Sequence, residues 1–268
     1  MEAPIFIFSL PRAGSTLIQR VLMSNKDICS VAEPWILLPQ IYSLKKEGTL
    51  SEYSSLTAYS AAQDFIGNLP QKEKDYYASL KLFISDLYKK QCRNNERYFL
   101  DKTPRYYLII DEIVNLFPEA KFVFLFRNPI HVYASVVTTW GNNRFNKIRS
   151  SYDDIVLGSK LLSQGYLKHK DKSISINYET FVTDFESELK RVTDYLEIEF
   201  YHTLLKNFNK QDTKGSLGDP TGVNKYASIS SQSIDNWKGV FNSGLRKRFA
   251  LRLLNKIDAD DLETQGYN

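Results

Sequence analysis

The chain has 268 residues, of which 43% are hydrophobic and 25% are charged, with a net charge of +4. This is the composition of an ordinary globular protein, and its basicity suits a small anionic ligand but is too weak and diffuse for nucleic acid. No segment resembles a secretory signal or reaches the roughly 18 apolar residues needed to cross a membrane. Cys29 and Cys92 form neither a CxxC pair nor a disulfide framework. We therefore expect a cytoplasmic protein in a reducing compartment.

Short apolar runs alternate with helical segments along the chain. The runs predict strands at "PIFIFS", "ICSVAEP", "RYFLDKTP", "AKFVFLF" and "SISINY". Helices are expected at "STLIQRVLMSN", several times between 35 and 92, at "YYLIIDEIVNLF", "NPIHVYASVVTTW" and "FESELKRVTDYLEI", and over about 243–256. A long loop is expected over residues 210–230. The alternation indicates an α/β fold with a central parallel sheet of about five strands, helices on both faces, and a ligand at the carboxyl ends of the strands.

The loop after the first strand has the sequence "SLPRAGSTL" over residues 9–17. Gly14 permits a close backbone approach, and the amide groups that follow lie at a helix N-terminus, where they can converge on an anion. An ATP-binding loop of the form GxxxxGK[ST] would place Lys at the position of Ser15. Here the cation inside the loop is Arg12. The pattern predicts a P-loop NTPase-like three-layer fold whose loop binds an anion other than the γ-phosphate of ATP.

The most strand-like run, "KFVFLF", ends in Arg127, where an ATP-hydrolysing relative would carry a magnesium-binding Asp. Ser135 lies eight residues further on, on the helix face that also carries His131 by i,i+4 spacing. Arg127 and Ser135 are expected to hold a second phosphate, separate from the first. Asp101 in "YFLD" is an alternative magnesium ligand, although Lys102 follows it directly. Two anion sites without an obvious metal site indicate a ligand phosphorylated at two ends.

Five segments, in order, resemble sulfotransferases that use 3′-phosphoadenylyl sulfate (PAPS). "PRAGSTL" is similar to their 5′-phosphosulfate loop, "DKTPRY" to their (D/E)KTP segment and "FRNPIHVYAS" to their 3′-phosphate motif. "INYETFVTDFESELKRVTDYLEIEF" resembles the strand and helix that follow, and "VNKYASISSQSIDNWK" resembles the loop that closes over the nucleotide. The resemblance runs from residue 4 to about 238. It implies one sulfotransferase domain over 1–268, with a helical segment at about 35–97 on the acceptor side.

The resemblance assigns roles to individual residues in the donor site. Arg12 matches the loop cation that contacts the 5′-phosphosulfate. The cradle for the 5′-phosphate is implied at Ala13, Gly14, Ser15 and Thr16, with Ala13 in place of the usual Ser. Arg127 and Ser135 match the 3′-phosphate ligands. In the closing loop, Lys225 matches a nucleotide-binding Lys, although Asn224 could serve instead. The implied donor is PAPS, the implied product is adenosine 3′,5′-bisphosphate (PAP), and no metal is implied.

Transfer to a hydroxyl group also needs a proton acceptor. "AEP" resembles the segment in which the tyrosylprotein branch of the family keeps a Glu base, so Glu33 is the candidate base. Lys102 resembles the Lys that stabilises the sulfuryl group in that branch. The chain has three histidines. His131 lies beside the 3′-phosphate motif, at the wrong end of the donor for a base, and His169 and His202 lie far from every motif.

The sequence thus predicts a PAPS-dependent sulfotransferase that acts on a hydroxyl group of a small molecule, glycan or lipid. A protein tyrosine also stays open as the acceptor, and the oligomeric state is not predicted. Two other classes remain as alternatives. One is a degenerate P-loop kinase, which would require magnesium and bind ATP. The other is a catalytically silent nucleotide- or glycan-binding module, which would not need Arg12, Glu33 and Lys102 together.

Overall fold

The sheet at the centre of the protein has five strands. The computed structural model describes residues 1–46, 48–50, 54–145, 149–202, 204, 208 and 232–267. All the strand pairs are parallel, and the order across the sheet is β2-β3-β1-β4-β5. The strands are β1 (Ala3–Ser9), β2 (Ile28–Ser30), β3 (Tyr98–Asp101), β4 (Lys121–Phe126) and β5 (Ser173–Asn177). The expected parallel sheet of about five strands is confirmed.

Continuous apolar runs form the central strands because helices cover both faces of the sheet. Every residue of β1 is buried, and β4 is buried from its second residue on. Phenylalanine rings from these two strands pack against one another, with Phe8 5.1 Å from Phe124 and 6.0 Å from Phe122 between ring centroids. Side chains on both faces of β1 and β4 therefore pack in the core, and these two strands show no alternation of polar and apolar residues.

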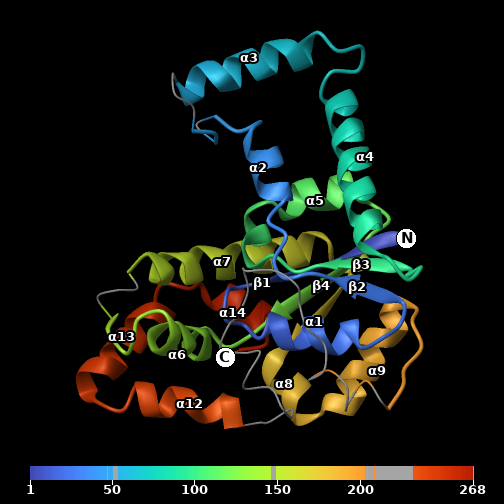
Figure 1. Cartoon of the computed structure of the whole chain (residues 1–268). Helices are drawn as coiled ribbons and strands as arrows, with labels where there is room; N and C mark the ends of the chain where they lie inside the picture. Colours follow the sequence, from blue (N-terminus) through green and yellow to red (C-terminus); the bar gives the residue numbers. More distant parts are fainter. Residues whose placement is uncertain are drawn as a thin grey trace.

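Helices form a layer on each side of the sheet, as Figure 1 shows. On one side lie α1 (Ser15–Met23), α8 (Tyr178–Thr183) and α9 (Phe185–Leu196). On the other lie α5 (Ile110–Leu116) and α7 (Arg149–Lys168). Against α6 (Pro129–Thr139) pack α12 (Gln232–Val240) and α13 (Gly244–Leu254), and α14 (Ala259–Thr264) packs against α7. As predicted, Asn128 caps α6 by accepting a hydrogen bond from the Ile130 N–H group.

Two helices project away from the sheet and form what we call the arm, α3 (Ser55–Gly67) and α4 (Glu73–Gln91) (Figure 1). The short α2 (Leu37–Tyr42) precedes them. In the arm α3 buries only Ile66, whereas α4 buries Leu80, Ile84 and Tyr88 near the sheet. The described residues between 35 and 92 contain helices and no strand, as the sequence predicts.

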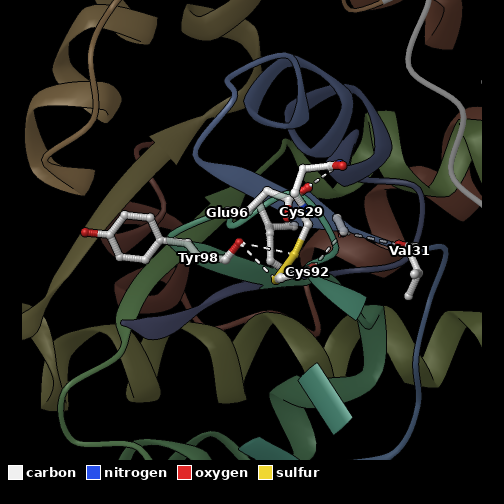
Figure 2. Close-up of a disulfide and its surroundings, with 8 residues drawn as sticks. Cys29, Val31, Cys92, Glu96 and Tyr98 are labelled. Atoms are coloured by element: carbon white, nitrogen blue, oxygen red, sulfur yellow. Dashed lines mark hydrogen bonds between the residues drawn. A yellow bond between two sulfur atoms is a disulfide. The ribbon is translucent and has the colours of Figure 1, made fainter. Parts of the chain in front are cut away.

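A disulfide ties the end of the arm to the edge of the sheet. Cys29 of β2 is bonded to Cys92, the residue after α4, with 5.6 Å between their Cα atoms. Figure 2 shows the bridge beside Tyr98, whose carbonyl oxygen lies 3.5 Å from the Cys29 sulfur. The prediction that these cysteines form no disulfide is therefore wrong. They are 63 residues apart, and only the return of α4 to β2 and β3 brings them together.

The structure differs from the predicted elements in several places. β2 ends at Ser30 instead of continuing to Pro34, because Gln19 of α1 donates hydrogen bonds to the Ser30 hydroxyl and the Val31 carbonyl as the chain leaves the sheet. The sequence did not predict α7, α8, α12 or α14, whereas α13 confirms the helix expected over about 243–256. The loop predicted at 210–230 lies outside the described residues. Among the described helices, none has both the length and the apolar character to cross a bilayer.

Candidate active site

One pocket lies where the carboxyl ends of the strands meet. Its volume is about 370 Å³. Because the strands are parallel, the segments that follow them converge at one edge of the sheet. Among the described residues, the pocket is lined by Pro11, Arg12, Gly14, Ser15, Thr16, Glu33, Trp35, Pro104, Arg105, Arg127, Ser135 and Trp140. Segments that follow β1, β2, β3 and β4 thus supply one site.

The loop between β1 and α1 is built around Gly14, whose φ is 98°. This left-handed conformation favours glycine, and a Cβ atom here would lie 2.3 Å from the Tyr178 ring. The helix α1 begins at the next residue, so its first amide groups open toward the pocket that Ser15 and Thr16 line. Unlike its neighbours, Ala13 does not line the pocket, because its methyl group is buried in the core. The loop therefore has the close backbone approach and the helix N-terminus expected of an anion cradle.

Two arginines, Arg12 and Arg127, are in contact at this loop. Arg127 is 7% exposed, lies over the Tyr178 ring at 4.2 Å, and donates a hydrogen bond of 3.1 Å to the Arg12 carbonyl. Arg12 in turn donates from Nε to the Ser135 hydroxyl at 3.2 Å. The sequence predicts two separate phosphate sites, whereas the structure shows their ligands in contact within one pocket. A ligand with two phosphate groups would neutralise both cations at once.

Glu33, which lines the pocket, forms an ion pair with the buried Lys102. Lys102 Nζ lies 2.8 Å from Glu33 Oε1, and the two side chains are 1% and 14% exposed. The second carboxylate oxygen of Glu33 accepts a hydrogen bond of 3.1 Å from the Trp35 indole. Glu33 follows β2 and Lys102 follows β3, so the pairing of these strands brings the two residues together. The candidate base and the candidate sulfuryl-stabilising cation are therefore direct partners.

Asp101, the alternative magnesium ligand, faces the core instead of the pocket. Its carboxylate accepts hydrogen bonds from the hydroxyl groups of Tyr88, Thr103 and Tyr106. Burial raises the pKa of Asp101 to about 6, against the opposing effect of these three donors. Both carboxylate oxygens are already used inside the protein. Asp101 thus lacks the position of a magnesium ligand at the phosphate loop, which weakens the kinase alternative.

None of the three histidines lines the pocket in the described structure. His131 contacts Glu179 at 2.7 Å and stacks on Trp237. Burial acts to raise the pKa of Glu179, but the hydrogen bonds with His131 and Tyr267 hold it below its usual value. The ring of His169 lies 2.7 Å from Asp111, and His202 is exposed. These positions leave Glu33 as the candidate base. The closing-loop candidates, Lys225 and Asn224, lie outside the described residues.

Four residues at the site were missed in the sequence. Trp35, Arg105 and Trp140 line the pocket, and Tyr178 lies beneath both Gly14 and Arg127. The Arg105 guanidinium is held 2.8 Å from Asp154 of α7. Trp35 and Arg105 immediately follow the "AEP" and "KTP" segments, and Tyr178 lies in "INYETF". The position of these three residues beside or within the matching segments could have identified them from the sequence, whereas no motif pointed to Trp140.

The comparisons with known proteins agree on one family. A sequence model of the Sulfotransferase family matches residues 4–202. The nodulation protein NoeE of Sinorhizobium fredii is 31% identical over 140 residues, which are 51% of this chain but only 31% of that protein. The chain thus matches about a third of the length of this relative. A putative protein-tyrosine sulfotransferase of Caenorhabditis briggsae is 22% identical over 100% of this chain and 90% of that protein.

Solved structures of the same kind share the fold. The sulfotransferase domain from the curacin biosynthetic pathway superposes with a TM-score of 0.61 at 20% identity, over 96% of this chain and 99% of that one. Mouse sulfotransferase SULT7A1, solved in complex with PAP, superposes with a TM-score of 0.54 at 13% identity, over 100% of this chain and 90% of that one. The predicted P-loop-like three-layer fold is therefore confirmed.

Proposed function

Because the chain belongs to the sulfotransferase family, we propose that it transfers the sulfuryl group of PAPS to a hydroxyl acceptor and releases PAP. The observation that carries this proposal is one pocket lined by Arg12, Arg127 and Glu33, with the buried Lys102 paired to the Glu33 carboxylate. Such a pocket combines cations for a ligand with two phosphate groups and a carboxylate for a proton. The PAP complex of the mouse sulfotransferase, which shares the fold, supports the choice of nucleotide.

The donor would be held by groups from three segments. The amide groups after Gly14, with the hydroxyl groups of Ser15 and Thr16, suit the 5′-phosphate because a helix N-terminus favours anions. Arg127 and Ser135 suit the 3′-phosphate. Arg12 connects the two regions, since it belongs to the loop, its backbone carbonyl accepts from Arg127 and its side chain donates to Ser135. In the family resemblance Ala13 belongs to the cradle, and here it contributes backbone alone.

The chemical step is an in-line displacement at sulfur. The acceptor oxygen forms a bond to sulfur as the bond from sulfur to the 5′-phosphate oxygen breaks, and that oxygen keeps the electron pair. Glu33 takes the acceptor proton. Protonation of Glu33 removes its charge, so Lys102 loses its ion-pair partner as negative charge develops on the sulfuryl and leaving oxygens. Arg12 and Lys102 are then the cations that stabilise the transition state, which is loose and governed by charge and positioning.

The direct test is single-turnover transfer from labelled PAPS to pools of glycans, lipids, small alcohols and tyrosine-containing peptides, with PAP and AMP binding measured by calorimetry on the same sample. We expect transfer that persists in EDTA, and PAP affinity well above that of AMP. Equal affinity for PAP and AMP would contradict the two-phosphate site. A magnesium requirement with ATP binding would support the kinase alternative, and tight PAP binding without transfer to any pool would support a silent binding module.

A further inference from the structure

A chain of buried hydrogen bonds lies directly behind the Glu33–Lys102 pair. It is centred on Asp101, the last residue of β3, which is completely buried. Asp101 Oδ1 accepts from the Thr103 hydroxyl at 2.9 Å, and Oδ2 accepts from the Tyr106 hydroxyl at 3.1 Å and from the Tyr88 hydroxyl. A carboxylate only accepts, so each hydroxyl group must donate its proton inward and turn its lone pairs outward.

The loop that carries Glu33 is attached to these outward lone pairs at two points. The Trp35 N–H group donates to the Thr103 hydroxyl at 3.2 Å, and the Leu37 N–H group donates to the Tyr106 hydroxyl at 3.2 Å. Trp35 has a φ of 56°, in the left-handed region that side chains other than glycine seldom adopt. Such a conformation persists where its surroundings hold it in place. The hydrogen bond from Trp35 to Thr103 is a contact that does so.

Both contacts to the Glu33 carboxylate come from residues that this network holds. The indole of Trp35 donates to Oε2, and Lys102, which lies between Asp101 and Thr103 in the chain, reaches Oε1. Lys102 is itself buried, so its ammonium group is directed at Glu33 from a fixed position. The orientation of the Glu33 carboxylate therefore depends on a residue of β3 that does not line the pocket.

We propose that Asp101 and Thr103 are positioning residues that act through Trp35 to hold the Glu33 carboxylate against Lys102. Asp101 fixes the direction of the Thr103 hydroxyl, Thr103 fixes the backbone of Trp35, and the Trp35 indole fixes one oxygen of Glu33. The assignment rests on the proposed role of Glu33 as the base. It adds a function for the buried carboxylate and for the tryptophan, neither of which the transfer step uses directly.

The test compares Thr103→Val, which removes the hydroxyl at nearly constant volume, with Thr103→Ser, which keeps it. In Thr103→Val the Trp35 N–H group and one lone pair of Asp101 lose their buried partners. We expect kcat to fall about ten-fold or more in Thr103→Val and to return to within about three-fold of wild type in Thr103→Ser. The Kd for PAP should stay within about two-fold in both, because neither variant changes a residue of the donor site.

A second readout does not depend on turnover. The chain has three tryptophans, so a nitrogen–proton correlation spectrum shows three indole signals, and Trp35→Phe identifies the one from Trp35. We expect the Trp35 signal to move in Thr103→Val and to stay in Thr103→Ser, while the signals of Trp140 and Trp237 stay in both. If wild-type protein transfers nothing from PAPS, the proposed function fails, and this spectrum still decides whether Thr103 positions Trp35.

Three results would overturn the positioning role. The first is a Trp35 signal that does not move in Thr103→Val. The second is movement of all three signals, which would indicate general loosening. The third is a Thr103→Ser variant as slow as Thr103→Val. Should Thr103→Val fail to fold, Thr103→Ala removes the same hydroxyl and carries the same expectations for kcat, for PAP binding and for the Trp35 signal.

Discussion

The carboxyl edge of the sheet and the arm differ in which kinds of side chain they bury and which they expose. At the sheet edge charged groups are buried, as Asp101, Lys102 and Arg127 show. On the arm large apolar groups are exposed, with Phe65 69%, Leu82 73% and Phe83 50% accessible. Burying a charge costs stability unless the charge is paired, and exposed apolar side chains that gather in one patch often mark an interaction site. The contrast teaches that the sheet edge holds charged groups in the interior, whereas the outward face of the arm leaves apolar side chains in solvent.

The largest effect is expected on kcat when the carboxylate of Glu33, at the sheet edge, is replaced. Glu33→Gln keeps one oxygen to accept from either Trp35 or Lys102 but cannot take up a proton, so kcat should fall by roughly 10²–10⁴-fold. The Kd for PAP should change by no more than a few-fold, since the donor site lies on other segments. Single-turnover transfer and calorimetry on one sample measure both quantities. Glu112→Gln, at a surface ion pair with Lys45, is the matched control and should leave both unchanged. A Glu33→Gln variant that transfers at the wild-type rate would clear Glu33 of the role of base.

The next effect concerns the covalent link between the two regions. Reduction of the Cys29–Cys92 bond frees a loop with a sequence separation of 63 residues, which enlarges the unfolded ensemble. The free energy of unfolding should fall by about 2–4 kcal/mol. Urea unfolding with and without a reductant measures the change. A variant with Ser at both positions should match the reduced protein and show no response to reductant. Equal stability of the oxidised and reduced protein would mean that the bond adds nothing to the attachment of the arm.

A smaller effect tests whether Arg127 at the sheet edge distinguishes PAP from AMP. Arg127→Ala removes a charged hydrogen-bond donor, so PAP binding should weaken by about 1.5–3 kcal/mol. Binding of AMP, which lacks the 3′-phosphate, should change little, and this makes AMP the internal control in the same calorimetric series. Equal losses for the two nucleotides would assign Arg127 to the support of the loop, through its bond to the Arg12 carbonyl, and not to the 3′-phosphate.

The smallest effect is expected at an exposed side chain of the arm. Phe83 is half-exposed and its neighbour Ile84 is fully buried on the same helix, so the two form a matched pair. Phe83→Ala should change the free energy of unfolding by less than about 0.5 kcal/mol, whereas Ile84→Ala should cost about 2–5 kcal/mol. If the segment at about 35–97 shapes the acceptor site, Phe83→Ala should also raise the acceptor KM a few-fold at unchanged PAP affinity. An unchanged KM for every arm variant would place the acceptor site elsewhere.

The sequence alone predicted much of the fold and several of the residues that line the pocket. Continuous apolar runs separated by helical segments are a local signal, and they predicted the five parallel strands. Parallel strands bring their carboxyl ends to one edge, so Arg12, Arg127 and Glu33 could be assigned to one region without coordinates. Ser15 stands where an ATP-binding loop has Lys, and Arg127 stands where a magnesium-binding Asp is expected. These are also local signals, and they indicated a ligand other than ATP with magnesium.

What only the tertiary structure decided depends on contacts between distant segments. The order β2-β3-β1 places Glu33 on Lys102, 69 residues away, and turns Asp101 into the core although it precedes Lys102 by a single position. The return of the arm pairs Cys29 with Cys92. Neither result follows from spacing or residue type, because each depends on which strand lies beside which and on the face from which a side chain leaves its strand. Local patterns therefore predicted which segments supply the site, and packing determined which atoms meet there.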